Sequence, residues 1–141
     1  MGKFVFIFAA LIVIFMTSNL GVNKANAAGF YCTSSDNPCK DAQMYWGKQQ
    51  FVATGSVYLY KGQLAYYEWG NDPSGLMQVS FAIYNSSGTR VSPEKVAAGS
   101  YSGGENYGTW TVSATGYYYL FAACEGGNDT RCVGSGKITL W

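Results

Sequence analysis

MQVSFAIY, residues Met77–Tyr84, has the clearest periodic pattern in the chain. Its odd-numbered positions, from Met77 to Ile83, are all large and apolar, whereas the even-numbered positions are polar, small or tyrosine. Side chains on a β-strand point alternately to its two faces, so a period of two over eight residues predicts a half-buried strand. This stretch decides the fold class, because its period does not fit a helix.

A second stretch, Tyr117–Cys124 with the sequence YYYLFAAC, is also predicted to be a strand. Three consecutive tyrosines followed by leucine and phenylalanine cannot all face one core, because neighbouring side chains alternate between faces. Either this strand is buried on both faces, or it displays aromatic rings on its outer face.

Sixteen glycines divide residues 28–141 into short segments of this kind. The pattern predicts seven or eight short strands in an antiparallel β-sandwich, an all-β and jelly-roll-like single domain over residues 28–141. Only Pro38–Gln50 could form a helical turn or two. Lys61-Gly62 is predicted to be a turn before a returning strand, and Glu125–Asp129 a hairpin loop. Ala98–Gly108 is predicted to be a long loop, and Gly134 and Gly136 a flexible kink.

Residues 1–27 are typical of a secretory signal peptide. Lys3 precedes an apolar run of thirteen residues, Phe4–Met16, and Ala25-Asn26-Ala27 supplies a cleavage site after Ala27. The alternative, an uncleaved membrane anchor, needs about 20 apolar residues, and polar Thr17 comes too early for that. We expect a secreted protein, of bacterial origin from the form of the signal.

The net charge argues against some classes of binding partner, and the cysteine content predicts disulfides. Without Lys3 and Lys24 the chain has seven basic and eight acidic residues, so there is no electrostatic reason to bind nucleic acid or an anionic membrane. The four cysteines, all beyond residue 27, predict two disulfides in an oxidising compartment; they are Cys32, Cys39, Cys124 and Cys132. Three pairings are possible. The local one, which closes loops worth about 2.5 kcal/mol each, is favoured because Cys124 and Cys132 flank a turn.

The sequence gives little evidence for a catalytic site or a metal site. The chain has no histidine, which excludes Ser-His-Asp and Cys-His arrangements, and neither cysteine spacing fits a zinc site. Glu68, between Tyr67 and Trp69, is the one carboxylate placed inside a predicted strand; it is a candidate for glycoside hydrolysis or, as the plainer alternative, a solvated outward residue. We predict no enzyme activity, no metal and no cofactor.

Thr109–Phe121, with the sequence TWTVSATGYYYLF, resembles the late hairpin of jelly-roll modules in bacterial extracellular proteins. Pre-peptidase C-terminal domains and several carbohydrate-binding modules are similar to it. The resemblance covers about thirteen residues and implies the sandwich architecture. It also implies that Tyr118 and Leu120 point inward, with Tyr117, Tyr119 and Phe121 on the opposite face.

Tyrosine is unusually frequent, with twelve in residues 28–141. Core packing accounts for a first group of aromatic residues, namely Tyr67, Trp69, Phe81, Trp110 and Tyr118. A second group is predicted to face outward by strand parity, where a tyrosine ring can bind a ligand while its hydroxyl stays in water. These candidate binding residues are Tyr58, Tyr60, Tyr66, Tyr84, Tyr117 and Tyr119.

The sequence therefore predicts a small, secreted, monomeric and non-catalytic binding module. Its expected partner is a glycan or cell-surface polymer, or else an extracellular protein, recognised through exposed tyrosines. The alternative is a secreted antagonist, such as a bacteriocin-like toxin or an enzyme inhibitor, and a third hypothesis is a small hydrolase centred on Glu68.

Overall fold

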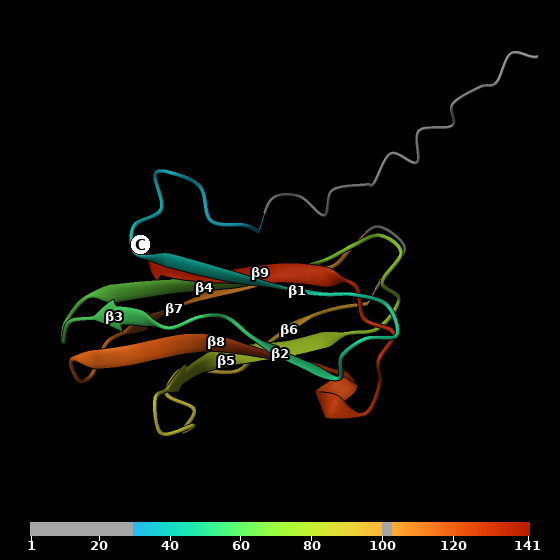
Figure 1. Ribbon diagram of the computed structural model, residues 1–141. Helices are drawn as coiled ribbons and strands as arrows, with labels where there is room; N and C mark the ends of the chain where they lie inside the picture. The colour runs from blue at the N-terminus through green and yellow to red at the C-terminus, as the bar shows by residue number, and fades with distance from the viewer. Residues whose placement is uncertain (1–29, 100–102) are drawn as a thin grey trace, which may run out of the picture.

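The computed structural model describes residues 30–99 and 103–141, which form two antiparallel β-sheets packed face to face (Figure 1). The strands are β1 (Cys39–Met44), β2 (Phe51–Ala53), β3 (Val57–Leu59), β4 (Leu64–Asn71), β5 (Val79–Asn85), β6 (Lys95–Ala97), β7 (Glu105–Thr111), β8 (Gly116–Cys124) and β9 (Gly134–Leu140). The predicted all-β antiparallel sandwich is confirmed, with nine strands in these residues rather than seven or eight. The predicted signal peptide, residues 1–27, lies outside the described residues.

The two sheets have a simple order. Sheet A has the order β1-β9-β4-β7, and sheet B has the order β2-β8-β5-β6, with β3 also paired to β8. Most connections pass from one sheet to the other. The turn predicted at Lys61-Gly62 is present, but the strand after it does not return along β3, and the hairpin loop predicted at Glu125–Asp129 is wrong. The first joins β3 in sheet B to β4 in sheet A, and the second contains a 3₁₀ turn, η1 (Glu125–Gly127), on the way from β8 to β9. Turn residues signal a change of direction, but they do not say which sheet the next strand joins.

The core lies between the two inner faces. Val79, Phe81 and Ile83 of β5 are at most 1% exposed, which confirms the predicted inward face of this strand, although Met77 precedes the strand and is only partly buried. From sheet A, the ring of Tyr67 meets that of Phe81 edge-on, with 5.9 Å between their centroids. Other core residues include Leu59, Trp69, Val112, Tyr118, Leu120 and Ile138, whereas Trp110 is only partly buried.

The segment with a weak helical pattern is a strand. Residues 39–44 form β1, which pairs with β9 from Cys39↔Thr139 to Met44↔Gly134. The expected helical turn is therefore wrong over this part. A weak local preference is overridden here because β9 offers an unpaired edge and Met44 becomes fully buried when β1 pairs with it.

Several glycines that we predicted to lie in loops or kinks lie inside strands instead. Aromatic rings from the neighbouring strand pack directly over them. A Cβ on Gly136 would lie 2.5 Å from a Trp69 ring atom, and one on Gly108 would lie 2.5 Å from a Tyr67 ring atom. β9 is continuous from Gly134, so the predicted kink is wrong, and β7 begins at Glu105 within the predicted loop. The glycines provide room for the large rings rather than flexibility.

Both disulfides are local, as the sequence favoured. Cys32 pairs with Cys39 and Cys124 pairs with Cys132. Cys124 and Cys132 are fully buried and tie the end of β8 in sheet B to the segment that enters β9 in sheet A. Cys32–Cys39 instead fastens the N-terminal segment, residues 30–38, to the start of β1. Among residues 30–99 and 103–141, no helix is long and apolar enough to cross a membrane.

The two disulfides should therefore differ in their contribution to stability. Replacing Cys124 and Cys132 together by alanine should lower the free energy of unfolding by about 2.5 kcal/mol, from loop entropy alone. Urea denaturation followed by tryptophan fluorescence would measure the loss. The double replacement of Cys32 and Cys39 is the control, because it opens a loop of nearly the same length. We expect a smaller loss there, since residues 30–38 can detach without unfolding the sandwich; equal losses would contradict this assignment.

Candidate functional site

The outer face of sheet B carries a band of aromatic rings along β8. Alternation on β8 places Tyr117, Tyr119 and Phe121 on this face, while Tyr118 and Leu120 are 4% and 1% exposed in the core. The inward orientation implied for Tyr118 and Leu120 is thus confirmed. We call the following set the aromatic face: Phe51, Tyr58, Tyr60, Tyr84, Tyr117, Tyr119 and Phe121.

Strand register brings these rings together from four segments. Tyr58 of β3 lies opposite Tyr117, with ring centroids 4.9 Å apart, and Tyr60 contacts Tyr58 edge-on at 5.3 Å. Tyr84 of β5 lies opposite Tyr119, and their rings stack at 6.0 Å. Tyr117 and Tyr119 are two positions apart on one strand, about 7 Å, so the two groups adjoin.

Two phenylalanines extend the band toward the far end of β8. The Phe121 ring lies 5.3 Å from that of Tyr84 and 5.6 Å from that of Phe51 on β2, with the two phenylalanine rings stacked. Every ring of the aromatic face therefore has at least one aromatic neighbour. Aromatic contacts of this kind hold ring orientations in place, which makes the surface rigid before any ligand arrives.

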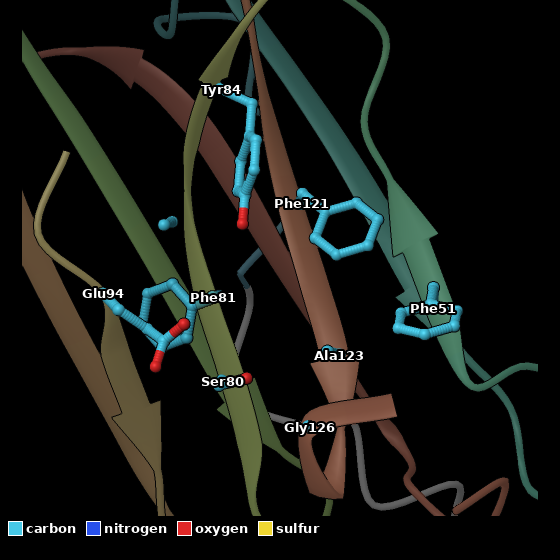
Figure 2. A pocket seen from close by; sticks show the side chains of 9 residues that line it. Phe51, Ser80, Phe81, Tyr84, Glu94, Phe121, Ala123 and Gly126 are labelled. Carbon is cyan, nitrogen blue, oxygen red and sulfur yellow. The ribbon is translucent and has the colours of Figure 1, made fainter. Parts of the chain in front are cut away.

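A hollow of about 240 Å³ opens beside these phenylalanines. Figure 2 shows Phe51, Phe121 and Tyr84 standing around it on three neighbouring strands, with Glu94 at one side. The floor is formed by three small side chains, Ser80, Ala82 and Ala123. Ser80 lies opposite Ala123 on the neighbouring strand, whereas Ala82 lies opposite the large ring of Phe121. The hollow exists because these small residues alternate with large rings on the same face.

Among the described residues that line the hollow, Glu94 is the one charged side chain. The Glu94 carboxylate at the side of the hollow lies 3.2 Å from the Arg90 guanidinium, so the two charges offset each other at the surface. The other polar side chains in its lining are those of Ser80 and Tyr84, which carry hydroxyl groups. This arrangement suits an uncharged ligand that offers both apolar surface and hydroxyl groups.

The structure separates the six tyrosines predicted from the sequence into two sets. Tyr58, Tyr60, Tyr84, Tyr117 and Tyr119 share the aromatic face, whereas Tyr66 lies on the outer face of sheet A beside Tyr107 and Trp141. Tyr58, Tyr60 and Tyr117 are 44%, 59% and 56% exposed. Tyr66, Tyr84 and Tyr119 are only half-buried rather than openly displayed, because neighbouring rings cover part of each.

Two members of the aromatic face, Phe51 and Phe121, were not among the predicted binding residues. The resemblance of Thr109–Phe121 to jelly-roll modules already implied that Phe121 lies on the outer side of β8, so a signal for it was present. Phe51 gave no such signal, because β2 has only three residues and its pairing with β8 is decided by the fold.

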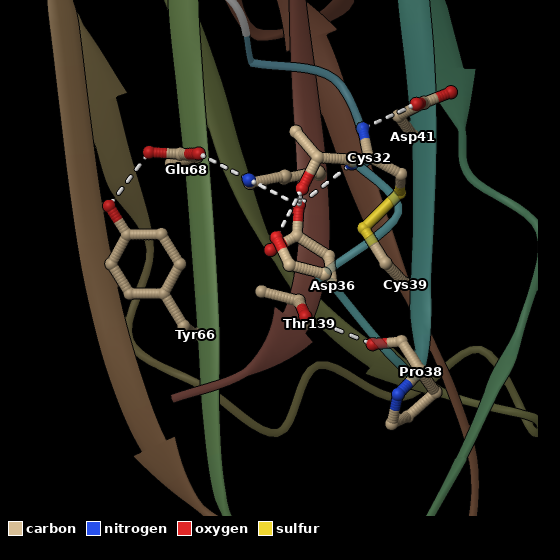
Figure 3. Close-up of polar contacts among 11 residues, drawn as sticks. Cys32, Asp36, Pro38, Cys39, Asp41, Tyr66, Glu68 and Thr139 are labelled. Atoms are coloured by element: carbon tan, nitrogen blue, oxygen red, sulfur yellow. Dashed lines mark hydrogen bonds and ion pairs between the residues drawn. A yellow bond between two sulfur atoms is a disulfide. The ribbon is translucent and has the colours of Figure 1, made fainter.

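Glu68, the candidate catalytic residue, lies on the outer face of sheet A. One carboxylate oxygen accepts a hydrogen bond from the Tyr66 hydroxyl at 2.7 Å, and the other lies 3.5 Å from the Lys137 ammonium (Figure 3). These contacts to Tyr66 and Lys137 hold the Glu68 carboxylate in place on the outer face of sheet A. In the described part of the chain, no three histidine, cysteine or acidic side chains are grouped to hold a metal ion.

Comparison with known proteins adds little to this geometry. No protein-family model matches the sequence, and no curated protein is significantly similar to it. Among solved structures, the chain is similar to the CBM22-1 xylan-binding domain from Paenibacillus barcinonensis Xyn10C. The likeness has 14% sequence identity and a TM-score of 0.40, over 74% of this chain and 82% of that domain.

Proposed function

We propose that this protein is a secreted, non-catalytic module that binds a glycan or another cell-surface polymer through the aromatic face. The observation that carries the proposal is the gathering of seven aromatic rings from four segments on one side of sheet B. Two disulfides are consistent with an oxidising, extracellular setting.

The ring chemistry favours a sugar polymer. A sugar ring has an apolar face of C–H groups and an edge of hydroxyls, and a tyrosine offers a flat apolar ring and a hydroxyl. Rings fixed by their neighbours lose little conformational entropy on binding. The exposed cluster of Tyr58, Tyr60 and Tyr117 provides flat stacking surface, and the hollow beside Phe121 could take a substituent of the polymer.

A pull-down on insoluble polysaccharides tests the proposal. The purified protein is mixed with xylan, cellulose, chitin or peptidoglycan, and the fraction that sediments is measured against a protein of similar size that has no aromatic surface. Retention by at least one polymer, competed by its soluble fragments, is the expected result. No retention by any of these glycans, together with killing of competing cells or inhibition of a protease, would instead favour the secreted antagonist.

Single alanine substitutions locate the binding surface. Tyr117→Ala and Phe121→Ala should each weaken retention by about tenfold, because each removes a central ring, and central aromatic residues contribute more than 1 kcal/mol to binding. Affinity is measured from depletion isotherms, and thermal melts verify that each variant is folded.

Tyr107→Ala is the matched control for these variants. Tyr107 is 61% exposed, comparable with Tyr117, but lies on the opposite sheet. It should leave retention by xylan and cellulose unchanged, since these polymers carry no amino group. If Tyr107→Ala abolished retention while Tyr117→Ala and Phe121→Ala did not, the aromatic face would not be the binding surface.

A further inference from the structure

The outer face of sheet A contains a second cavity, of about 230 Å³, on the side of the sandwich opposite the aromatic face. It is lined by three aromatic residues and two acidic ones, with one asparagine: Phe30, Tyr66, Glu68, Glu105, Asn106 and Tyr107. This composition differs from that of the hollow on sheet B, where the only carboxylate is paired with an arginine at the rim.

Aromatic rings form the walls of this cavity. The Tyr66 and Tyr107 rings lie 5.9 Å apart with 30° between their planes. Phe30 lies across the surface of β4 at Gly70, where a Cβ would overlap its ring, so glycine at this position allows the phenylalanine to close one side. The exposed ring of Trp141 supports Tyr66 from behind, at 5.1 Å.

Carboxylate groups outnumber ammonium groups around the cavity. The Lys137 ammonium lies 3.0 Å from the Asp36 carboxylate and 3.5 Å from that of Glu68, and so serves two carboxylates (Figure 3). Glu105 also lines the cavity and has no ion-pair partner among residues 30–99 and 103–141. Lys137 thus offsets part of the charge of Asp36 and Glu68, and of the two carboxylates that line the cavity, Glu105 is left without a paired cation in the described part of the chain.

The tyrosine hydroxyl at the cavity adds no negative charge of its own. Burial, the hydrogen bond to Glu68 and the nearby charges of Glu68 and Glu105 all raise the pKa of Tyr66 above its ordinary value. The hydroxyl consequently stays protonated and donates to Glu68.

We infer that this cavity binds an organic ammonium group, with Phe30, Tyr66 and Tyr107 contacting its apolar surface and Glu68 and Glu105 balancing its charge. Cations are attracted to the negative faces of aromatic rings, most strongly where water is partly excluded. The excess of carboxylates supplies charge complementarity and disfavours anions. The volume suits a head group or a single substituent rather than a complete large ligand.

The ammonium group could belong to an amino sugar or to a choline-like head group, and small probes distinguish the two. Choline and glucosamine are titrated into ¹⁵N-labelled protein, and chemical shifts of the sheet A amides are followed. The neutral counterparts are 3,3-dimethylbutanol for choline and N-acetylglucosamine for glucosamine. We expect one or both ammonium probes to saturate shifts around Tyr66 and Tyr107, with their neutral counterparts at least about tenfold weaker.

Two variants complete the test. Glu105→Gln should weaken binding of the ammonium probe about threefold to tenfold and reduce its dependence on salt, without affecting folding, since Glu105 is exposed. Tyr107→Ala should weaken it to a similar extent, whereas Tyr117→Ala should leave it unchanged. The inference is overturned if neutral and ammonium probes bind equally, if the shifts map to the aromatic face, or if neither probe produces saturable shifts. Polysaccharide retention by the aromatic face is measured separately, so either proposal can fail alone.

Discussion

Replacing Trp69 with alanine should lower the free energy of unfolding by about 3–5 kcal/mol, the range for truncating a large buried aromatic residue. Trp69 is 0% exposed and is the largest of the fully buried side chains. Its ring fills the space that Gly136 leaves on β9, and its indole N–H donates to the Asn71 side-chain oxygen at 3.0 Å. Alanine would therefore leave both a cavity and an unpaired buried acceptor.

Urea denaturation and thermal melts by circular dichroism would measure this loss, which corresponds to a fall in Tm of roughly 10–20 °C. Trp141→Ala is the matched control, because Trp141 is 74% exposed and contacts only the outer surface of sheet A. We expect the control to change stability by less than about 1 kcal/mol. Similar losses in the two variants would mean that Trp69 does not anchor the core.

Asn71→Asp should be nearly as damaging at neutral pH, although the two side chains have the same shape. Asn71 is 4% exposed, and its amide nitrogen donates to the backbone carbonyls of Met77, Ala97 and Ala98 at 3.1–3.3 Å. These bonds join the end of β4 in sheet A to the segments that enter β5 and leave β6 in sheet B. A carboxylate would place negative charge against three carbonyl oxygens, at a cost of about 3 kcal/mol or more.

The loss in Asn71→Asp should depend on pH. Burial and the facing carbonyls raise the pKa of the introduced carboxyl in the folded state above its value of about 3.9 in the unfolded chain. The folded state then binds more protons than the unfolded state. The difference in stability from the wild type should be smallest below about pH 3.9 and should grow as the pH rises to the folded-state pKa. Urea titrations of both proteins at matched pH values would show this.

Asn85→Asp is the control for Asn71→Asp. The Asn85 side-chain oxygen accepts hydrogen bonds from the backbone N–H groups of Ser87 and Thr89, both at 3.0 Å. An aspartate preserves this acceptor at a partly exposed turn, so we expect a change of less than about 0.5 kcal/mol and little dependence on pH above about pH 4. Below that pH the two N–H donors, which favour the carboxylate, make the sign of the dependence opposite to that of Asn71→Asp. A pH-independent loss in Asn71→Asp would show that its carboxyl reaches water in the folded state.

The candidate site was only partly predictable from the sequence. Parity along each strand correctly separated Tyr117 and Tyr119 from Tyr118, because alternation is a property of one strand. It could not show that Tyr66 belongs to the other sheet, since Tyr58 and Tyr66 lie on consecutive strands with the same pattern. Nor could it reveal the cavity on sheet A, where Phe30, Tyr66 and Glu105 come from distant parts of the chain.

The sequence by itself determined the sheet class and the inward face of β5, and it favoured the local pairing of the cysteines because Cys124 and Cys132 flank a turn. These features depend on alternation and on residues close together in the chain, so short-range patterns encode them. Only the tertiary structure decided that β3 and β4 join different sheets, that β1 is a strand, and that glycines such as Gly136 lie beneath aromatic rings. Those outcomes depend on which edge is free and which side chain needs space, and both are set by residues far away in sequence.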